Sequence, residues 1–320
     1  MKRSGKGVLV GVLLWGATGS AWATHPVLGG DSGKGAGPLV TPAAGNLGPG
    51  RGALDLQVDH LVFDTFGEGR LRRFAERDRE VHDLESVTTY TLSASYGLGR
   101  FVTVHLGVPY VVRLGIEESE PPDEVHRHGD ARGVGDAAGH LHVRLFGSEA
   151  WGIEATGILA VKAPTGQTRV RDREGERFEA EFQPGTGSWD VTAGAAVSQA
   201  YGPFSLHGSM RYTWVTEGTQ STDLGDRLNY DFAFVVRVPP PLRVDLALEA
   251  NGLWQAKERV SGEEDPDSGG GVLLVTPGVR FRLHPRFNAY VAAGFPVWQN
   301  LNGDQNEVRV RVLAGVGGAF

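Results

Sequence analysis

The sequence predicts an all-β protein: a single antiparallel up-and-down transmembrane β-barrel of about twelve strands that follows an N-terminal signal peptide. Three observations predict it. Apolar and polar residues alternate with a period of two through most of the chain. The alternating segments are joined by connections that are short and long in turn. The stretch 307–320 alternates to its end and places the aromatic residue Phe320 on its apolar face.

Composition narrows the class further. The chain has 320 residues, 47 of them glycine, and a net charge of -7. Frequent glycine along the chain favours tight turns and closely packed strands over helices. The absence of cysteine excludes disulfides and cysteine-ligated metal sites. No apolar run approaches the ~18 residues of a membrane-spanning helix, so a membrane location requires a barrel.

The beginning of the chain divides into two parts. Residues 1–23 combine a basic start, an apolar stretch at 7–16 and a small-x-small site at 21–23, which predicts a signal peptide. Residues 24–52 are rich in Gly, Pro and Ala and show no period, which predicts a flexible segment. This segment is either a disordered periplasmic tail or a partial plug of the barrel mouth. Residues 53–320 form the predicted barrel.

Each strand is predicted by its own alternation. In the first strand, for example, Leu54, Leu56 and Val58 alternate with Asp55 and Asp59. The predicted strands lie around 53–64, 86–98, 101–113, 135–146, 151–163, 188–199, 203–215, 227–238, 242–254, 272–283, 287–298 and 307–320.

The connections and the aromatic residues support the same topology. Short connections near 97–100, 147–150, 200–202, 239–241 and 284–286 alternate with long ones near 66–85, 114–134, 164–187, 216–226, 256–270 and 299–306. Short periplasmic turns and long outer loops are typical of outer-membrane barrels, whereas a soluble sandwich has no reason to sort its loops in this way. Aromatic residues at both strand ends predict two interfacial belts. The predicted location is therefore the bacterial outer membrane.

The polar face of the strands must line the lumen, because a Lys or Arg at the bilayer midplane costs about 2–4 kcal/mol. Both signs of charge occur there, and in the narrow lumen of about twelve strands we expect many of them to pair. The residues predicted to line the lumen are Asp55, Asp59, His105, Arg144, Glu154, Lys162, Asp190, Arg211, Asp231, Arg237, Arg243, Asp245, Glu249, Arg280, Arg282, Arg309 and Arg311.

The remaining candidate sites have simpler interpretations. His126 and His128 lie in an acidic loop and are weak candidate metal ligands, and a solvated acidic loop is the simpler interpretation. The stretch 66–85 is either a short helix or a solvated charged loop. Lys162 to Gly166 lacks the spacing of a phosphate-binding loop. A membrane hydrolase would need Ser, His and an orienting group on the outward face. The only outward His inside a predicted strand is His60, and no outward Ser accompanies it at a recognisable spacing. We therefore expect no catalytic residues, no cofactor and no enzyme activity.

Several short motifs resemble a known family. The stretch 307–320 resembles the closing strand of outer-membrane barrels, with Phe320 as the assembly signal. The stretches S-Y-G-L-G-R-F-V-T-V-H-L-G-V-P-Y (95–110), G-V-G-D (133–136), V-K-A-P-T-G (161–166) and T-P-G-V-R-F (276–281) resemble the outer-membrane transporter family named for the meta-pathway of phenol degradation.

The resemblance implies a channel or transporter for passive uptake of small solutes, among them aromatic or apolar compounds. The alternative is a closed-lumen structural or surface-interaction protein of the outer membrane. The expected partners are outer-membrane lipid and lipopolysaccharide, the barrel assembly machinery and a small-molecule solute, with no nucleic acid.

Overall fold

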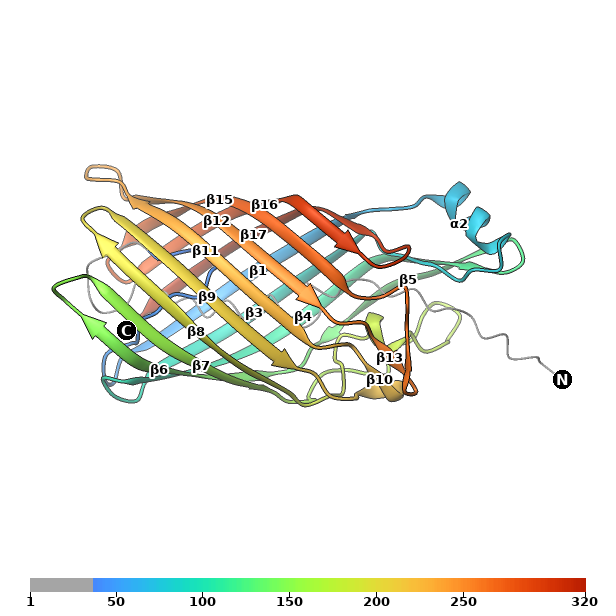
Figure 1. Cartoon of the computed structure of the whole chain (residues 1–320), viewed down its shortest axis with the longest axis horizontal. Helices are drawn as coiled ribbons and strands as arrows, with labels where there is room; N and C mark the ends of the chain where they lie inside the picture. The colour runs from blue at the N-terminus through green and yellow to red at the C-terminus, as the bar shows by residue number, and fades with distance from the viewer. Residues whose placement is uncertain (1–36) are drawn as a thin grey trace.

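The computed structural model describes residues 37–320, and twelve antiparallel strands of this part close into one barrel (Figure 1). The strands follow one another around the barrel in chain order. They are β1 (Gly52–Asp64), β3 (Ser86–Gly97), β4 (Val102–Glu120), β6 (Ala138–Ser148), β7 (Ile153–Lys162), β8 (Asp190–Tyr201), β9 (Phe204–Trp214), β11 (Arg227–Arg237), β12 (Val244–Gln255), β15 (Gly270–His284), β16 (Phe287–Leu301) and β17 (Glu307–Ala319). The barrel closes where β1 pairs with β17, which confirms the predicted fold class. The predicted signal peptide lies outside the described residues.

The alternation of each strand sorts its side chains between lipid and lumen. On β12, Leu246 and Leu248 are 50% and 53% exposed, whereas Asp245 before them and Glu249 after them are 3% and 1% exposed. Exposed leucine, valine and aromatic side chains cover the outside of the barrel in the same way. Because this apolar outer face needs lipid around it, the barrel lies in the bacterial outer membrane. No helix within residues 37–320 is long and apolar enough to cross a membrane.

Exposed aromatic residues mark both ends of the barrel wall. One set lies near the long loops, and the other near the short turns. The first set includes Tyr110, Trp189, Trp214, Trp254 and Trp298, and the second includes Tyr96, Trp151, Phe204, Phe287 and Phe320. Aromatic residues are enriched at the two membrane interfaces, where the hydrocarbon meets the polar head groups.

The two ends of the barrel differ in complexity. The end with the C-terminus carries short turns, whereas the opposite end carries α2 (Glu68–Ala75), β5 (Glu124–Val134) and a small sheet of β10 (Thr222–Asp223), β13 (Arg259–Val260) and β14 (Glu263–Glu264) (Figure 1). There β4 continues beyond the barrel and pairs with β5 and with β2 (His82–Asp83). The stretch 66–85 thus contains a short helix, in which Leu71 and Phe74 are buried.

The seam between the first and last strands extends to Phe320. Its amide donates to the Gly52 carbonyl at 2.9 Å, and the Gly52 amide donates to its carbonyl at 3.0 Å. The Phe320 side chain is 70% exposed on the outer face. A Cβ atom at Gly52 would lie 2.4 Å from the Phe320 ring, so the ring occupies space that only glycine leaves open.

Phe320→Asp is expected to lower the folded fraction of the protein, because it removes the outward aromatic group of the seam that we propose the assembly machinery recognises. The measurement is the heat-modifiable folded band on gels after expression in cells. Tyr201→Asp is the matched control, since Tyr201 is another exposed aromatic residue, at the end of β8 near a short turn. An equal folded fraction in both variants would contradict the role given to Phe320.

Candidate functional site: the lumen and its two obstructions

Most of the charged residues predicted to line the lumen do point into it. Asp55, Asp59, His105, Lys162, Asp190, Asp245, Glu249, Arg280 and Arg311 are buried inside the barrel. A second group is partly buried on the same face, namely Arg144, Glu154, Arg211, Asp231, Arg237 and Arg282.

Two predicted lumen residues are exposed instead. Arg309 was assigned to the face of Arg311, but its side chain is 70% exposed and lies 3.9 Å from the exposed Asp64. The register of β1 and β17 shifts between Val62 and Phe63, so one extra residue on β17 turns Val308 inward and Arg309 outward. Arg243 has the parity of a lumen residue but precedes β12, and it is exposed in the turn before that strand.

Ion pairs connect the lumen charges across neighbouring strands. Arg311 donates to both carboxylate oxygens of Asp59, at 2.9 and 2.6 Å, and both side chains are almost fully buried. The other pairs are Arg211–Asp231 at 3.2 Å, Arg282–Asp245 at 3.2 Å, Arg237–Asp245 at 3.6 Å and Arg144–Glu154 at 2.6 Å. The wall charges therefore neutralise one another.

Residues 37–47, called the inner segment here, lie inside the barrel. Three consecutive amides, those of Leu39, Val40 and Thr41, donate to the carboxylate of Glu249, and the Thr41 hydroxyl adds a fourth donor at 2.7 Å. Arg280 donates to the carbonyls of residues 37 and 38 at 2.8 and 2.6 Å. One carboxylate and one guanidinium thus bind the backbone of the inner segment.

The inner segment then crosses to the other side of the lumen. The Ala44 amide donates to Ser198 on β8 at 2.9 Å, and the Leu47 amide donates to Thr103 on β4 at 2.9 Å. Leu39 and Val40 pack against buried apolar residues of the wall, including Tyr290. The segment therefore fills the half of the lumen nearer the short turns.

Residues 163–189, called the outer loop here, fold back into the other half. The loop contains a short 3-10 helix, η2 (Ala180–Phe182), and residues 180–186 are all buried. Phe178 and Phe182 pack in one apolar cluster with inward-facing residues of the wall. The wall residues of this cluster include Leu61, Phe63, Val87, Val111, Leu253, Leu274 and Val308. The outer half of the lumen thus contains an apolar cluster to which two phenylalanines of the outer loop belong.

A buried ion-pair network holds the base of the outer loop. The Lys162 ammonium lies 2.9 Å from Asp136 and 3.3 Å from Asp190, and all three side chains are buried. Asp136 also accepts from the Gly166 amide and from the amide and hydroxyl of Thr186, at 2.7 to 2.8 Å.

The motifs G-V-G-D and V-K-A-P-T-G meet at this network. A Cβ atom at Gly166 would lie 2.7 Å from Gly185 Cα and 2.7 Å from the Gly135 carbonyl carbon. The motifs therefore supply both the charges and the close backbone contact that keep the outer loop inside. The sequence predicted Lys162 as a lumen residue but gave no sign of the role of Asp136, whose partners lie 26 to 50 residues away.

Histidines also gather on the lumen face. The rings of His105 and His142 lie 4.4 Å apart between centroids, and His140 pairs with His105 across β4 and β6. Ser95 hydrogen-bonds His105 at 2.7 Å. We interpret this histidine trio as polar packing on the lumen face.

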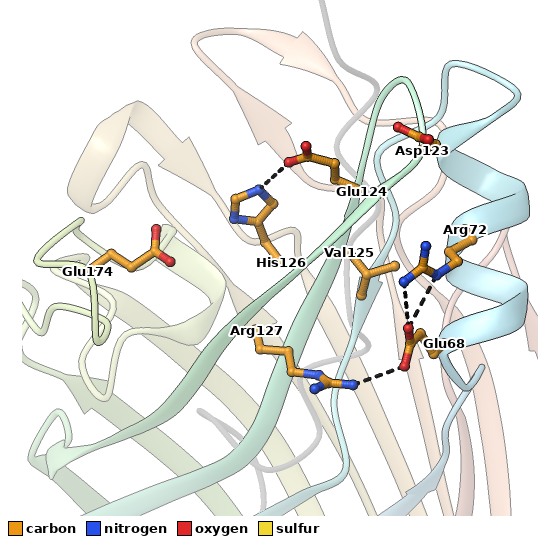
Figure 2. Close-up of a pocket in the computed structure, with 8 residues that line it drawn as sticks. All are labelled: Glu68, Arg72, Asp123, Glu124, Val125, His126, Arg127 and Glu174. Carbon is orange, nitrogen blue, oxygen red and sulfur yellow. Dashed lines mark hydrogen bonds and ion pairs between the residues drawn. The ribbon is translucent and has the colours of Figure 1, made fainter.

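The two candidate metal ligands, His126 and His128, lie on the hairpin formed by β4 and β5, called the outer hairpin here. His126 is 2.7 Å from Glu120 and 3.4 Å from Glu124. It lines an open pocket with α2 and Glu174, in which Arg72 and Arg127 pair with Glu68 (Figure 2). These groups are largely exposed, and exposed ion pairs contribute little to the stability of a protein.

His128 points elsewhere, between Glu118 and Asp172 of the outer loop, at 3.0 Å from each. Hydrogen bonds to Glu118 and Asp172 raise the pKa of His128 to about 9, although burial opposes the shift.

The contact of the outer hairpin with the outer loop is expected to loosen as pH rises through about 9, because the pKa of His128 is raised above its ordinary value of 6.5. The charged form stabilises the contact fully below pH 6.5, and this contribution disappears above the raised pKa. The measurement is the distance distribution between spin labels at positions 124 and 174. His128→Gln should give the broad distribution at every pH, and a pH response in that variant would assign the effect to another group.

Comparisons with known proteins bear on the family and on the barrel fold. The profile of the family described as "Putative MetA-pathway of phenol degradation" matches residues 64–301. The crystal structure of an outer membrane channel from Pseudomonas putida F1 is similar at 15% identity and a TM-score of 0.60, covering 86% of this chain and 97% of that chain. The NanC porin is similar at 7% identity and a TM-score of 0.46, covering 83% and 98%. No curated protein sequence matches the chain significantly.

Proposed function

We propose a channel function for this chain, which belongs to the family described as the MetA-pathway of phenol degradation. The protein admits small solutes through the barrel by passive diffusion once the inner segment and the outer loop move aside. The main support for this proposal is the way in which the inner segment and the outer loop are attached to the barrel wall. Neither is a strand of the barrel sheet, and each is held to the wall by a few side chains, Glu249 and Arg280 for one, Lys162 and Asp136 for the other.

Small apolar or aromatic compounds are the solute class that we propose. Support comes from the apolar cluster in the outer half of the lumen, where Phe178 and Phe182 lie against leucine, valine and phenylalanine of the wall. When the outer loop leaves, an apolar solute replaces these two rings without exposing the wall to water. The paired charges of the inner half then favour solutes without net charge.

The alternative is an outer-membrane protein with a permanently closed lumen that acts through its outer surface. A specific observation favours it, since both halves of the lumen are filled in this structure. The charged outer hairpin and α2 would then supply the interaction surface.

Conductance in planar bilayers distinguishes the two functions. The three forms to compare are the full chain, a variant lacking residues 24–49, and the same deletion combined with Phe178→Ala and Phe182→Ala. The channel function predicts that current increases along this series. Absence of current in all three forms, with the folded state confirmed by heat-modifiable migration, would favour the closed-lumen alternative.

A further inference from the structure

Beside the exposed trio of Glu120, Glu124 and His126, a second group of histidine and glutamate side chains could hold a metal ion, and it lies under the outer loop. His82 of β2 is 2% exposed and faces carboxylates on both sides of its ring. Its Nδ1 is 3.1 Å from Glu181, and its Nε2 is 3.4 Å from Glu179 and 3.3 Å from Glu118. One ligand atom from each of His82, Glu179 and Glu181 lies within 4.8 Å of the others.

A fourth carboxylate lies near this group. Glu258, in the connection after β12, is 2% exposed, and its Oε1 has no hydrogen-bond partner within residues 37–320. Glu181 is its strongest electrostatic neighbour, and Asp265 and Glu179 follow. A buried carboxylate oxygen without a hydrogen-bond partner is costly, and a cation bound near Glu258 would offset that cost.

The protein's own cations do not balance this group. Arg113 is fully buried, and Glu181 is its one electrostatic partner. His128 pairs with Glu118 on the other side. The four carboxylates of Glu118, Glu179, Glu181 and Glu258 therefore outnumber the basic groups Arg113, His128 and His82 around them.

We propose that His82, Glu179 and Glu181 bind a divalent metal cation of the Zn²⁺ or Mn²⁺ class, with the Glu258 carboxylate beside them. An imidazole ligand selects this class over Mg²⁺ and Ca²⁺, which take oxygen ligands alone. Ligands at about 2.0–2.2 Å from a tetrahedral ion lie about 3.3 Å from one another. The separation of 3.1 Å between His82 Nδ1 and the Glu181 carboxylate agrees with that spacing. Whichever nitrogen binds the ion, the other faces a carboxylate that orients the ring.

The site joins parts of the chain that the channel function needs to separate. His82 belongs to the β1–β3 connection, Glu179 and Glu181 to the outer loop, and Glu258 to the β12–β15 connection. Occupancy of the site therefore holds the outer loop in the lumen, whereas loss of the ion leaves mutually repelling carboxylates. In the exposed trio of Glu120, Glu124 and His126, no buried polar atom lacks a hydrogen-bond partner, so we do not extend the metal site to it.

Metal titration of the purified full-length protein, after treatment with a chelator, tests the site. We expect one Zn²⁺ or Mn²⁺ to bind per chain in calorimetry, with much weaker binding of Mg²⁺. His82→Gln and Glu181→Gln should each weaken binding by more than about tenfold, the scale of losing even an outer-shell partner. His126→Gln is the matched control and should bind as the unmodified protein does.

X-ray absorption of the Zn²⁺-loaded unmodified protein keeps the test independent of variant folding. One imidazole nitrogen with oxygen ligands supports the site. No binding to the chelator-treated protein, or binding lost in His126→Gln and kept in His82→Gln, would overturn the proposal. Either result leaves the conductance series unaffected, so the channel function and the metal site fail separately.

Discussion

Glu249→Ala is expected to release the inner segment from the barrel wall. The Glu249 carboxylate accepts from the amides of Leu39, Val40 and Thr41 and from the Thr41 hydroxyl. Each hydrogen bond to a charged group contributes about 1.5–3 kcal/mol. Loss of even one such contribution favours the released state by about tenfold or more, and alanine offers no replacement acceptor.

The chain offers a clean measurement because it has no native cysteine. A single cysteine at position 43, where Ala43 is 4% exposed, reports whether the inner segment is inside. We expect Glu249→Ala to raise its maleimide labelling rate by about tenfold or more.

Glu154→Ala is the matched control for this measurement. Glu154 is another carboxylate on the lumen face, and its ion-pair partner is Arg144 rather than the inner segment. A labelling rate that rises equally in both variants would mean general loosening of the barrel. An unchanged rate in Glu249→Ala would show that Glu249 does not hold the segment.

The barrel was predictable from the sequence because its two signals are local. Alternation follows from the geometry of a strand between lipid and lumen, as Leu246 and Asp245 illustrate, and loop length follows from the two sides of the membrane. Arg309 shows the limit of this reasoning. A bulge adds one residue without changing the composition of the strand, and every side chain beyond it changes face.

The obstructions of the lumen were not predictable in the same way. The inner segment has no period, and its partner Glu249 lies 208 to 210 residues away in the sequence. Backbone amides make most of these contacts, so the side-chain pattern of residues 39–41 does not reveal them. His82 and Glu258 likewise come from separate connections, and only folding of the outer loop brings them to Glu181.

Lys162→Met is expected to free the base of the outer loop and to destabilise it by about 3 kcal/mol, at the lower end for a broken buried ion pair. The lower value applies because Asp136 keeps three donors from the loop and Asp190 keeps Arg227 at 3.2 Å. In the variant, the buried carboxylates of Asp136 and Asp190 are no longer neutralised by an ammonium group. Thr186 and Ser188 also lose the hydrogen bonds that Lys162 donates to their hydroxyl oxygens.

Hydrogen exchange of residues 164–188 measures this effect directly. A loss of about 3 kcal/mol corresponds to exchange faster by about a hundredfold, provided that the loop opens locally. Lys257→Met is the control, since Lys257 pairs at 3.6 Å with the exposed Glu264 and such a pair contributes at most about 1 kcal/mol. The barrel strands should keep their protection in both variants. If exchange in the loop stays at the level of the unmodified protein, the loop is held by Phe178 and Phe182 in the apolar cluster rather than by Lys162, and opening must then begin at those rings.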